Sequence, residues 1–472
     1  MCSRILFRKG AGSLSDQIVA AGYGGSGLCG GRGACGKCRV RFPGQAPLPS
    51  SADRKFFTPA QLREGYRLAC TSRPGADCEV EICYEREPEM AILTATDETA
   101  PDGDRFPQAQ KLTAHTEGLF CAVDLGTTTV VMQLIEKREG TALDTYAFPN
   151  PQRVYGVDVL ARITAAGSGK AQALREALLA EMEKGLHRLE QYGRAEQIVV
   201  SGNTTMGHLL LGYPVESLGR APFTPYHIES SKFVLCGYPA IFLPGISAFV
   251  GADIVSGMYA CKLAEREELS LFIDLGTNGE MAVGSREGIL CTATAAGSAF
   301  EGGVSSQVMG TDMTALAGDM LAEGVLDETG LMREPWFTEG FRLGEIMVSQ
   351  KDIRNLQMAK AAICAGASIL LDRMDAWEKI SRVYLAGGFG YYLDVDKAVG
   401  IGLIPGVLQG KCRAVGNTSL AGAIRYGRNT QAGSSREEEK LRHIVEISRS
   451  LNLAQQPEFE NRYIEAMTFG RM

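Results

Sequence analysis

The chain reads LFCAVDLGTTTVV at residues 119–131 and LFIDLGTNGEMAV at residues 271–283. Each stretch is typical of an apolar strand with an aspartate near its end, a turn of Gly and Thr, and a second apolar strand. The second stretch repeats the first 150 residues further along the chain. Such a repeat predicts a domain made of two similar halves, each containing a β-hairpin.

Each half also contains a later strand, turn and helix pattern. In the first half IVVSGNTT at residues 198–205 leads into an apolar segment, and in the second half VYLAGGFG occupies residues 383–390. Turns of Gly and Thr can present N–H groups and hydroxyls to phosphates, and an aspartate can hold hydrated Mg²⁺ or orient a water. A Gly-Gly pair lets adenosine approach the backbone closely. These residue types predict a nucleotide site.

Four of the 13 cysteines form a second pattern near the N-terminus. They are Cys29, Cys35, Cys38 and Cys70, spaced C-x5-C-x2-C with the fourth on a separate segment. The first gap is one residue longer than in plant ferredoxins. Glycines between the first three allow the tight loop that an iron–sulfur cluster requires. We therefore predict that these four thiolates bind a [2Fe–2S] cluster.

Three other interpretations of this region are weaker. Structural zinc normally uses two C-x2-C pairs, and the chain has one. Cys78 and Cys83 flank an alternating strand pattern and are expected to be packing residues. Two G-x-G-x-x-G matches lie between residues 22 and 36, but neither follows a predicted strand or opens a helix, as a dinucleotide motif requires.

Composition limits the remaining possibilities. The chain has 472 residues, which suggests two or three domains, and a net charge of −7 without any Lys/Arg-rich run, which argues against nucleic acid. Residues 233–252 carry no charge, but their Pro and Gly residues indicate buried strands and turns rather than a membrane helix. Nothing resembles a signal peptide, and we expect a cytoplasmic protein without a membrane partner.

The patterns divide the chain into four parts. We predict an α+β head at residues 1–84, a linker at 85–117, an α/β domain at 118–428 with lobes 118–260 and 261–428, and a helical tail at 429–472. The linker is rich in Glu, Asp, Thr and Pro, and both a flexible tether and an ordered strap fit this composition.

Two resemblances give these parts a fold. The head resembles a β-grasp [2Fe–2S] ferredoxin with adrenodoxin-like spacing, including RLAC before the fourth ligand. The two DLGT turns and the later AGG resemble the actin, sugar-kinase, Hsp70 and acetate-kinase superfamily, abbreviated ASKHA. The resemblance implies a duplicated, actin-like ATPase domain that uses ATP and Mg²⁺.

Nearly the full chain is similar to the reductive activators of corrinoid proteins. Stretches that carry this similarity include NPQ at 150–152, GNTTM at 202–206, FVGAD at 249–253 and GNTSLAGA at 416–423. The resemblance implies ATP-dependent, one-electron reduction of Co(II) to Co(I) in the corrinoid protein of a methyltransferase or O-demethylase system. Its partners would be that corrinoid protein and an electron donor, either a protein or a flavin, and a homodimer is left open. The chain leaves little room for the extra middle domain of the longest relatives.

The same resemblance assigns roles to residues of the repeat. Asp124 and Asp274 would hold Mg²⁺ or polarise the attacking water, and are the predicted catalytic residues. The predicted phosphate and adenosine contacts are Gly126, Thr127, Thr128, Gly276, Thr277, Asn278, Gly387 and Gly388. Asp158 and Glu301 are weaker candidates, since either can be a helix cap or a surface acid. His208 lies on an apolar segment and is expected to be structural.

Rival functions remain open at this point. The chain could activate another low-potential enzyme, act as a redox-gated nucleotide sensor, or be a small-molecule kinase with an appended ferredoxin. Dehydratase activators resemble the same ATPase fold but share a [4Fe–4S] cluster between subunits, whereas this chain carries its own four cysteines.

Overall fold

A computed structural model describes residues 3–9, 14–20, 33, 36, 38–82, 118–276, 278–295, 310–343, 346–430 and 435–470. The predicted linker at 85–117 lies outside these residues. Among the helices that the structure describes, none combines the length and apolar character that a membrane span needs. The uncharged stretch 233–252 instead contributes to strands β9 (Ser231–Leu235) and β10 (Tyr238–Phe242) and to the start of helix α7 (Ala252–Ala260).

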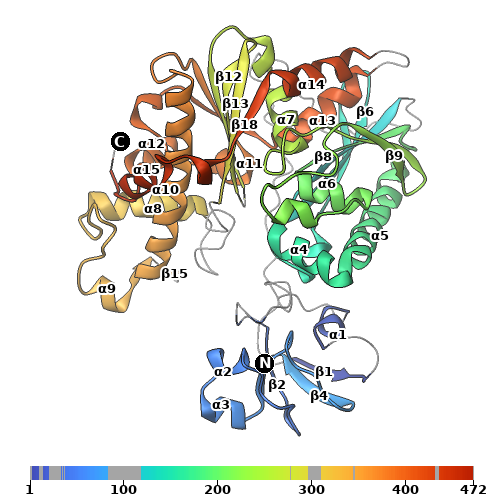
Figure 1. The fold of residues 1–472 in the computed structure, drawn as a ribbon, viewed down its shortest axis with the longest axis vertical. Coiled ribbons are helices and arrows are strands. Elements are labelled where there is room, and N and C mark those ends of the chain that lie inside the picture. Colours follow the sequence, from blue (N-terminus) through green and yellow to red (C-terminus); the bar gives the residue numbers. More distant parts are fainter. Residues whose placement is uncertain are drawn as a thin grey trace.

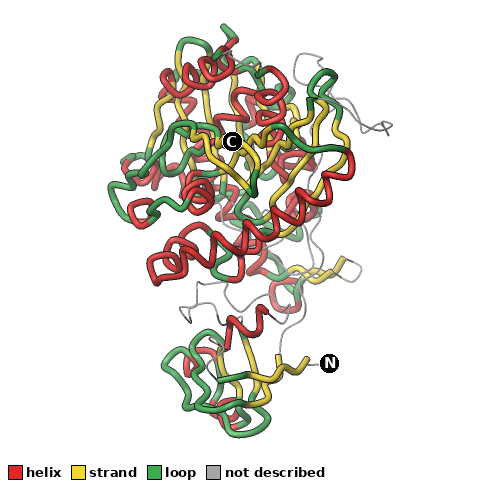
Figure 2. The backbone as a smooth tube through the Cα atoms, turned by 90° about the vertical axis from the view of Figure 1, so that its right-hand side faces the viewer, coloured by secondary structure: helices red, strands yellow, loops and turns green. Residues whose placement is uncertain are grey.

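The head is built on a four-stranded sheet in the order β1-β4-β2-β3. Its strands are antiparallel to their neighbours and its helices are short. The elements are β1 (Ser3–Phe7), α1 (Leu14–Ala20), β2 (Arg39–Arg41), α2 (Asp53–Phe56), α3 (Pro59–Arg63), β3 (Tyr66–Leu68) and β4 (Cys78–Ile82). The buried apolar residues of the head form a core of their own, and the half-buried Cys78 packs on this core, as predicted. In Figures 1 and 2 the head lies at one end of the molecule.

The larger part contains two six-stranded sheets with the same internal order. In the first, β5, β6 and β7 form an antiparallel meander, and β8 and β10 then add in parallel beside β5. In the second, β11, β12 and β13 repeat the meander, and β16 and β17 repeat the parallel additions. The duplication predicted from the hairpins is therefore a duplication of whole sheets.

The strands of the first sheet are β5 (Leu119–Leu125), β6 (Thr129–Glu136), β7 (Ala142–Pro149), β8 (Gln197–Gly202), β9 (Ser231–Leu235) and β10 (Tyr238–Phe242). Those of the second are β11 (Ser270–Leu275), β12 (Gly279–Ser285), β13 (Gly288–Thr294), β16 (Arg382–Ala386), β17 (Cys412–Gly416) and β18 (Ser448–Leu451). A separate hairpin consists of β14 (Phe341–Leu343) and β15 (Ile346–Val348).

Helices cover both sheets. The first lobe contributes α4 (Val159–Ala165), α5 (Ala171–Leu189), α6 (Thr204–Leu211) and α7 (Ala252–Ala260). The second contributes α8 (Gly310–Ala322), α9 (Trp336–Glu339), α10 (Gln350–Arg373), α11 (Gly387–Tyr392), α12 (Val395–Gly400) and α13 (Thr418–Asn429). Helix α10 packs on the outer face of the second sheet, where a second apolar core forms.

Helices α7 and α13 join the two lobes. They occupy equivalent places, because α7 follows the last parallel strand of the first repeat and α13 follows that of the second. A Cβ atom on Gly422 of α13 would lie 2.3 Å from the carbonyl oxygen of Ser256 on α7. The two helices therefore approach closely, and one apolar core runs from the first lobe through both helices to the second sheet.

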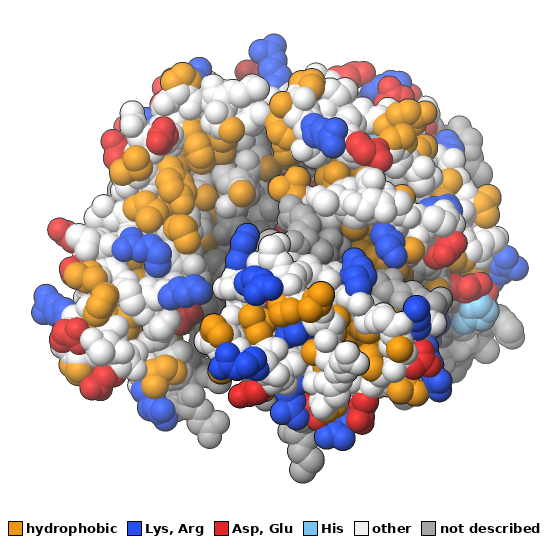
Figure 3. Space-filling model, turned by 60° about the horizontal axis from the view of Figure 1, so that its bottom comes forward, with side chains coloured by type: hydrophobic (Ala, Val, Ile, Leu, Met, Phe, Trp, Pro, Cys, Tyr) orange, Lys and Arg blue, Asp and Glu red, His pale blue; other side chains and the backbone are white. Residues whose placement is uncertain are grey.

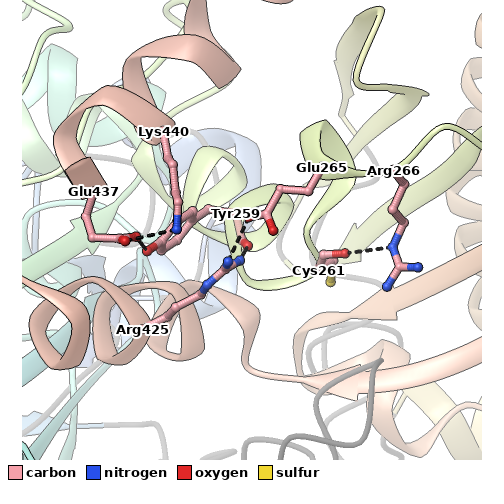
Figure 4. A network of polar contacts seen from close by, with 7 residues as sticks. All are labelled: Tyr259, Cys261, Glu265, Arg266, Arg425, Glu437 and Lys440. Carbon is pink, nitrogen blue, oxygen red and sulfur yellow. Dashed lines mark hydrogen bonds and ion pairs between the residues drawn. The ribbon is translucent and has the colours of Figure 1, made fainter.

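The C-terminal tail packs on this junction between the lobes. It contains α14 (Arg436–Ile447), β18 and α15 (Phe459–Glu465), and β18 pairs in parallel with β13. The prediction of a helical tail was therefore wrong for this strand. Figure 4 shows Glu437 of α14 accepting a hydrogen bond from the Tyr259 hydroxyl of α7, while Arg425 of α13 donates to the Tyr259 carbonyl oxygen. Burial, then the bond to Glu437, raises the pKa of Tyr259.

Candidate functional site

Two of the four predicted cluster ligands lie side by side in the described part of the head. The sulfur atoms of Cys38 and Cys70 are 3.4 Å apart, and both residues are buried. A disulfide would bring them to about 2.05 Å. A tetrahedral metal with metal–sulfur bonds of about 2.3 Å would hold its sulfurs about 3.8 Å apart. Cys29 and Cys35 lie outside the described residues, so the structure presents half of the predicted ligand set.

Two glycines let the ligand loop lie against its support. Gly33 and Gly36 have φ of +67° and +66°, values that side chains disfavour. A Cβ on Gly33 would lie 2.7 Å from Ala52 Cβ, and one on Gly36 would lie 2.4 Å from the ring of Phe56. Gly33 and Gly36 therefore lie directly against Ala52 and helix α2.

The Cys70 segment is fixed by a buried carboxylate. Asp53 of α2 accepts hydrogen bonds at 2.7 Å from the Leu68 N–H and from the N–H and hydroxyl of Ser50. The Ala69 N–H donates to the Cys38 carbonyl oxygen at 2.8 Å, which joins the two ligand segments. The two thiols thus meet because backbone bonds hold their segments together.

The electrostatics of this pair fit a metal cluster. The hydrogen bond with Cys38, and then burial, raises the pKa of Cys70, while the Gly33 N–H lowers it. Two adjacent buried thiols resist ionisation on their own, and a bound cationic metal makes thiolates favourable. The Gly33 N–H points at sulfur, a contact that tunes the potential of iron–sulfur clusters.

The first hairpin presents Asp124 to the second lobe. Its carboxylate accepts hydrogen bonds from Asn417 Nδ2 at 2.8 Å and from Ser419 Oγ at 2.7 Å, at the start of α13. The Ser419 hydroxyl continues to Ser201, and Ser201 to Ser256, in a chain of buried hydroxyls. Asp124 therefore links residues that are 293 positions apart in sequence.

Three polar side chains donate hydrogen bonds to the turn after Asp124. Asn150 donates to the Gly126 carbonyl oxygen at 2.8 Å, and Asn203 Nδ2 donates to the Thr127 hydroxyl at 2.8 Å. The fully buried Arg162 donates to the Thr127 carbonyl oxygen at 2.5 Å, and burial lowers its pKa to about 9. Together these side chains donate hydrogen bonds to two carbonyl oxygens and one hydroxyl of the turn.

The second hairpin brings two more carboxylates together. Asp274 on β11 lies opposite Glu280 on β12, and its other neighbour is Ala386 at the end of β16. Gly387 follows with φ of +80°, and a Cβ there would lie 2.6 Å from Asp274 Oδ1. Gly388 is the next residue, in the first turn of α11. The AGG pattern thus lies directly against the predicted catalytic aspartate.

Four acids of the two lobes influence one another electrostatically. Burial raises the pKa of Asp253 to about 7, and the charge of Asp124 adds to the effect. Burial, then the charges of Asp253 and Asp274, raises the pKa of Glu280 well above its usual value. Burial also raises the pKa of Asp124, against the bonds from Ser419 and Asn417. Without a cation, this group of carboxylates resists full ionisation.

Such an acidic group fits hydrated Mg²⁺ rather than a bare metal. Among the described residues, no three His, Cys, Asp or Glu side chains lie close enough together to cage an ion. Mg²⁺ retains several waters and is usually held by one or two carboxylates together with substrate phosphates. Asp124 and Asp274, one from each lobe, are suited to hold such an ion through its waters.

The described residues among the predicted nucleotide contacts lie at the two hairpin turns and at the end of β16. Asp124, Gly126, Thr127 and Thr128 lie at the first turn, and Asp274, Gly276 and Asn278 lie at the second, where Asn278 bonds Glu280. Thr277 and Glu301 lie outside the described residues. Asp158 caps helix α4 by accepting from the Ala161 N–H at 2.7 Å, so it is a helix cap. His208 is buried, with its Nδ1 2.7 Å from the Thr204 carbonyl oxygen, as a structural residue would be.

Sequence reasoning missed several residues of the site. Asp253 and Ser419 occupy the same second position of α7 and α13, yet one is an acid and the other a hydroxyl. Glu280 lies within the repeat, but the sequence pattern alone indicates no role for it. The signal was present in the polar stretches GAD and GNTS, but nothing local shows that GNTS bonds Asp124 or that Asp253 lies near Glu280.

Family models match three consecutive parts of the chain. Residues 5–75 match a 2Fe-2S iron-sulfur cluster binding domain, and residues 119–266 match the RACo middle region. Residues 268–320 and 308–472 match the C-terminal domain of RACo, described as the ASKHA domain. The RACo middle region therefore coincides with the first lobe.

Individual proteins with these features are similar over most of the chain. The corrinoid activation enzyme RamQ of Eubacterium limosum is 28% identical over 427 residues, covering 74% of this chain and 70% of RamQ. The [Co(II) methylated amine-specific corrinoid protein] reductase of Methanosarcina barkeri is 23% identical, covering 74% and 76%. A solved reductive activator for a corrinoid, iron-sulfur protein shares the fold, with a TM-score of 0.67, 24% identity and coverage of 99% and 98%.

Proposed function

Because this chain belongs to the family of reductive activators of corrinoid proteins, which join a [2Fe–2S] domain to an ASKHA domain, we propose that it uses ATP to reduce a corrinoid protein from Co(II) to Co(I). The acceptor would be the corrinoid protein of a methyltransferase or O-demethylase system. The observation that carries the proposal is the cross-lobe site, where Asp124 of one lobe bonds Asn417 and Ser419 of the other.

The energetics explain why an electron carrier needs an ATPase. Moving one electron uphill costs about 1.4 kcal/mol for each 59 mV. Plant-type clusters have potentials of about −400 mV, so a still lower acceptor is not reduced spontaneously. The cluster supplies one electron at a time when bound, and Cys29, Cys35, Cys38 and Cys70 would hold it. Lobe closure on ATP can supply the remaining free energy by changing the affinity for the partner or the coordination of its cobalt.

Each part of the cross-lobe site has a role in this proposal. The turn at residues 126–128 would present backbone N–H groups to the phosphates, Gly276 and Asn278 would lie beside them, and Gly387 and Gly388 would adjoin the adenosine. Asp124 and Asp274 would hold Mg²⁺ through its waters, and the ion would neutralise charge on the phosphates. Asp253, whose pKa is raised to about 7, can accept a proton from the attacking water. Asn417 and Ser419 of the second lobe orient Asp124 of the first. Their hydrogen bonds to Asp124 therefore depend on how the two lobes are placed.

The test measures ATP hydrolysis and the Co(I) absorption band together. With a Co(II) corrinoid protein and reduced cluster, we expect stimulated hydrolysis and the appearance of Co(I). Asp274→Asn should abolish Co(I) formation while leaving the cluster spectrum intact, and Asp158→Asn should retain both activities because Asn caps a helix equally well. ATP turnover that ignores every corrinoid partner, with phosphate transferred to a metabolite, would identify a kinase and refute the proposal.

A further inference from the structure

The head and the rest of the chain carry opposite charge. Residues 1–84 contain 12 Lys and Arg against 6 Asp and Glu, whereas residues 85–472 contain 36 against 49. A protein with a net charge of −7 therefore places its cluster ligands in a strongly basic head. Clustered charge of one sign on a surface steers the approach of charged partners.

Three acids of the head are paired with arginines on or beside β4, and a fourth is buried beside the Cys70 segment. Glu79 and Glu81 on β4 pair with Arg4, and Glu81 also pairs with Arg41 at 2.7 Å. Asp77, just before β4, pairs with Arg8 at 3.3 Å. Asp53 is buried in its bonds to Ser50 and Leu68. The β1–β4 edge is thereby close to neutral.

Four exposed bases instead surround the ligand segments, and we name them the cluster rim: Arg39, Arg54, Lys55 and Arg73. Arg39 follows ligand Cys38 and donates to the Gly36 carbonyl oxygen at 3.0 Å. Arg73 donates to the carbonyl oxygen of ligand Cys70 at 3.1 Å. Arg54 and Lys55 lie on α2 between Ala52 and Phe56, the two residues against which Gly33 and Gly36 lie.

The rim charges are free to meet a partner. In the described part of the chain, none of the four bases has a carboxylate partner. Arg39 and Arg73 are fixed by neutral carbonyls, and Arg39 also stacks over Phe57 with its Cζ 5.5 Å from the ring centre. Figure 3 views the molecule from the end where the head lies, and Lys and Arg side chains are spread over this face.

We propose that the cluster rim docks an acidic surface on the redox protein that exchanges an electron with the cluster. Electron transfer requires close approach to the ligand segments, and an acidic surface would find its complementary charges there. The proposal depends on the [2Fe–2S] head but not on ATP or cobalt, so it can fail or succeed independently of the proposed function.

The test uses small redox probes of opposite charge on the full-length protein with its cluster reduced. Stopped-flow oxidation by the anionic iron(III)–EDTA complex is compared with oxidation by the cationic hexaamminecobalt(III) ion as salt is varied. The net charge of the whole chain predicts that the anion is repelled, so that added salt speeds its reaction. The rim predicts the opposite sign: salt slows the anion and speeds the cation.

Two double variants provide the matched comparison, since each removes two positive charges from the head. Arg54→Gln with Lys55→Gln removes rim charges, and Arg4→Gln with Arg8→Gln removes charges of the β1–β4 edge. At low salt we expect the rim variant to react about fourfold more slowly with the anion, from two charges acting over about 10 Å in water. The edge variant should stay close to wild type. Equal effects of the two variants, or anion rates that rise with salt, would overturn the proposal.

A binding measurement gives a second readout that needs no electron transfer. The redox-inert, paramagnetic hexacyanochromate(III) anion should broaden the amide NMR signals of residues 39–41 and 71–73, and the rim variant should lose this broadening. Absence of site-specific broadening would contradict the proposal.

Discussion

Asp253 shows how a single buried acid makes the stability of the protein depend on pH. Its pKa is raised to about 7 in the folded chain and is near 3.9 in an unfolded one. Below about pH 4 the carboxyl is protonated in both states and has no effect. Between about pH 4 and 7 the unfolded chain releases this proton freely, whereas the folded chain must either keep it or bury a charge. The free energy of unfolding therefore falls as pH rises across this window.

Asp253→Asn should remove this dependence. We expect the thermal midpoint of the nucleotide-free protein to rise by a few degrees at about pH 8 and to change little at about pH 4. The measurement is thermal unfolding of the wild type and the variant across this pH range. An Asp253→Asn shift that does not vary with pH would show that the acid is not held near neutrality.

Gly387 is a second residue whose identity the site dictates. An alanine there would have to adopt φ of +80° and place its Cβ 2.6 Å from Asp274 Oδ1 and from the Leu275 carbonyl oxygen. We expect Gly387→Ala to weaken ATP binding by about tenfold or more, because the strand end and Asp274 must separate. Gly167→Ala, where the nearest atom is 3.9 Å away, is the control in an ATP titration. Unchanged affinity would mean that ATP does not use this strand end.

At the scale of elements, the crossing of α7 and α13 controls how the lobes meet. Gly422 is required there because the Ser256 carbonyl oxygen leaves no room for a side chain. Gly422→Ala should destabilise the protein by about 1–3 kcal/mol through overpacking, and should slow any closure of the lobes on ATP. Thermal unfolding and ATPase rates measure both effects.

The same experiment has a control within a helix of the second lobe. Gly400 ends helix α12, and a Cβ there would meet nothing within 4 Å. Gly400→Ala should therefore be neutral or slightly stabilising, since Ala is the better helix residue. If Gly422→Ala is equally harmless, the helices are further apart than the structure places them.

At the scale of the whole molecule, the head has its own core. Because the described residues of its core form a cluster separate from those of the lobes, loss of the iron–sulfur cluster should leave the nucleotide site intact. We expect Cys70→Ser to lose the visible absorption of the cluster and all reduction of the corrinoid protein, while ATP affinity stays within about twofold of wild type.

Cys78 offers the matched control for this variant. It packs on the same head core from the start of β4 but is not a predicted ligand. Cys78→Ser should keep the iron content and the spectrum. Loss of the cluster in Cys78→Ser, or its retention in Cys70→Ser, would show that the ligand assignment is wrong.

The sequence by itself determined the features that depend on neighbours along the chain. The hairpins around Asp124 and Asp274 follow from alternating apolar runs and Gly-Thr turns, and the ligand loop follows from cysteine spacing and glycines. It also indicated the duplication, since each half carries the same local signals. It missed β18, because a short polar strand beside β13 has no pattern that separates it from a helix end.

Only the tertiary structure decided which groups face the aspartates. Asn417 and Ser419 reach Asp124 because α13, which follows β17 of the second sheet, packs against α7 and against β5 and β8 of the first. The same arrangement places Asp253 near Glu280 and raises both pKa values. Burial and charge coupling depend on distances between segments far apart in sequence, and no local pattern encodes those distances.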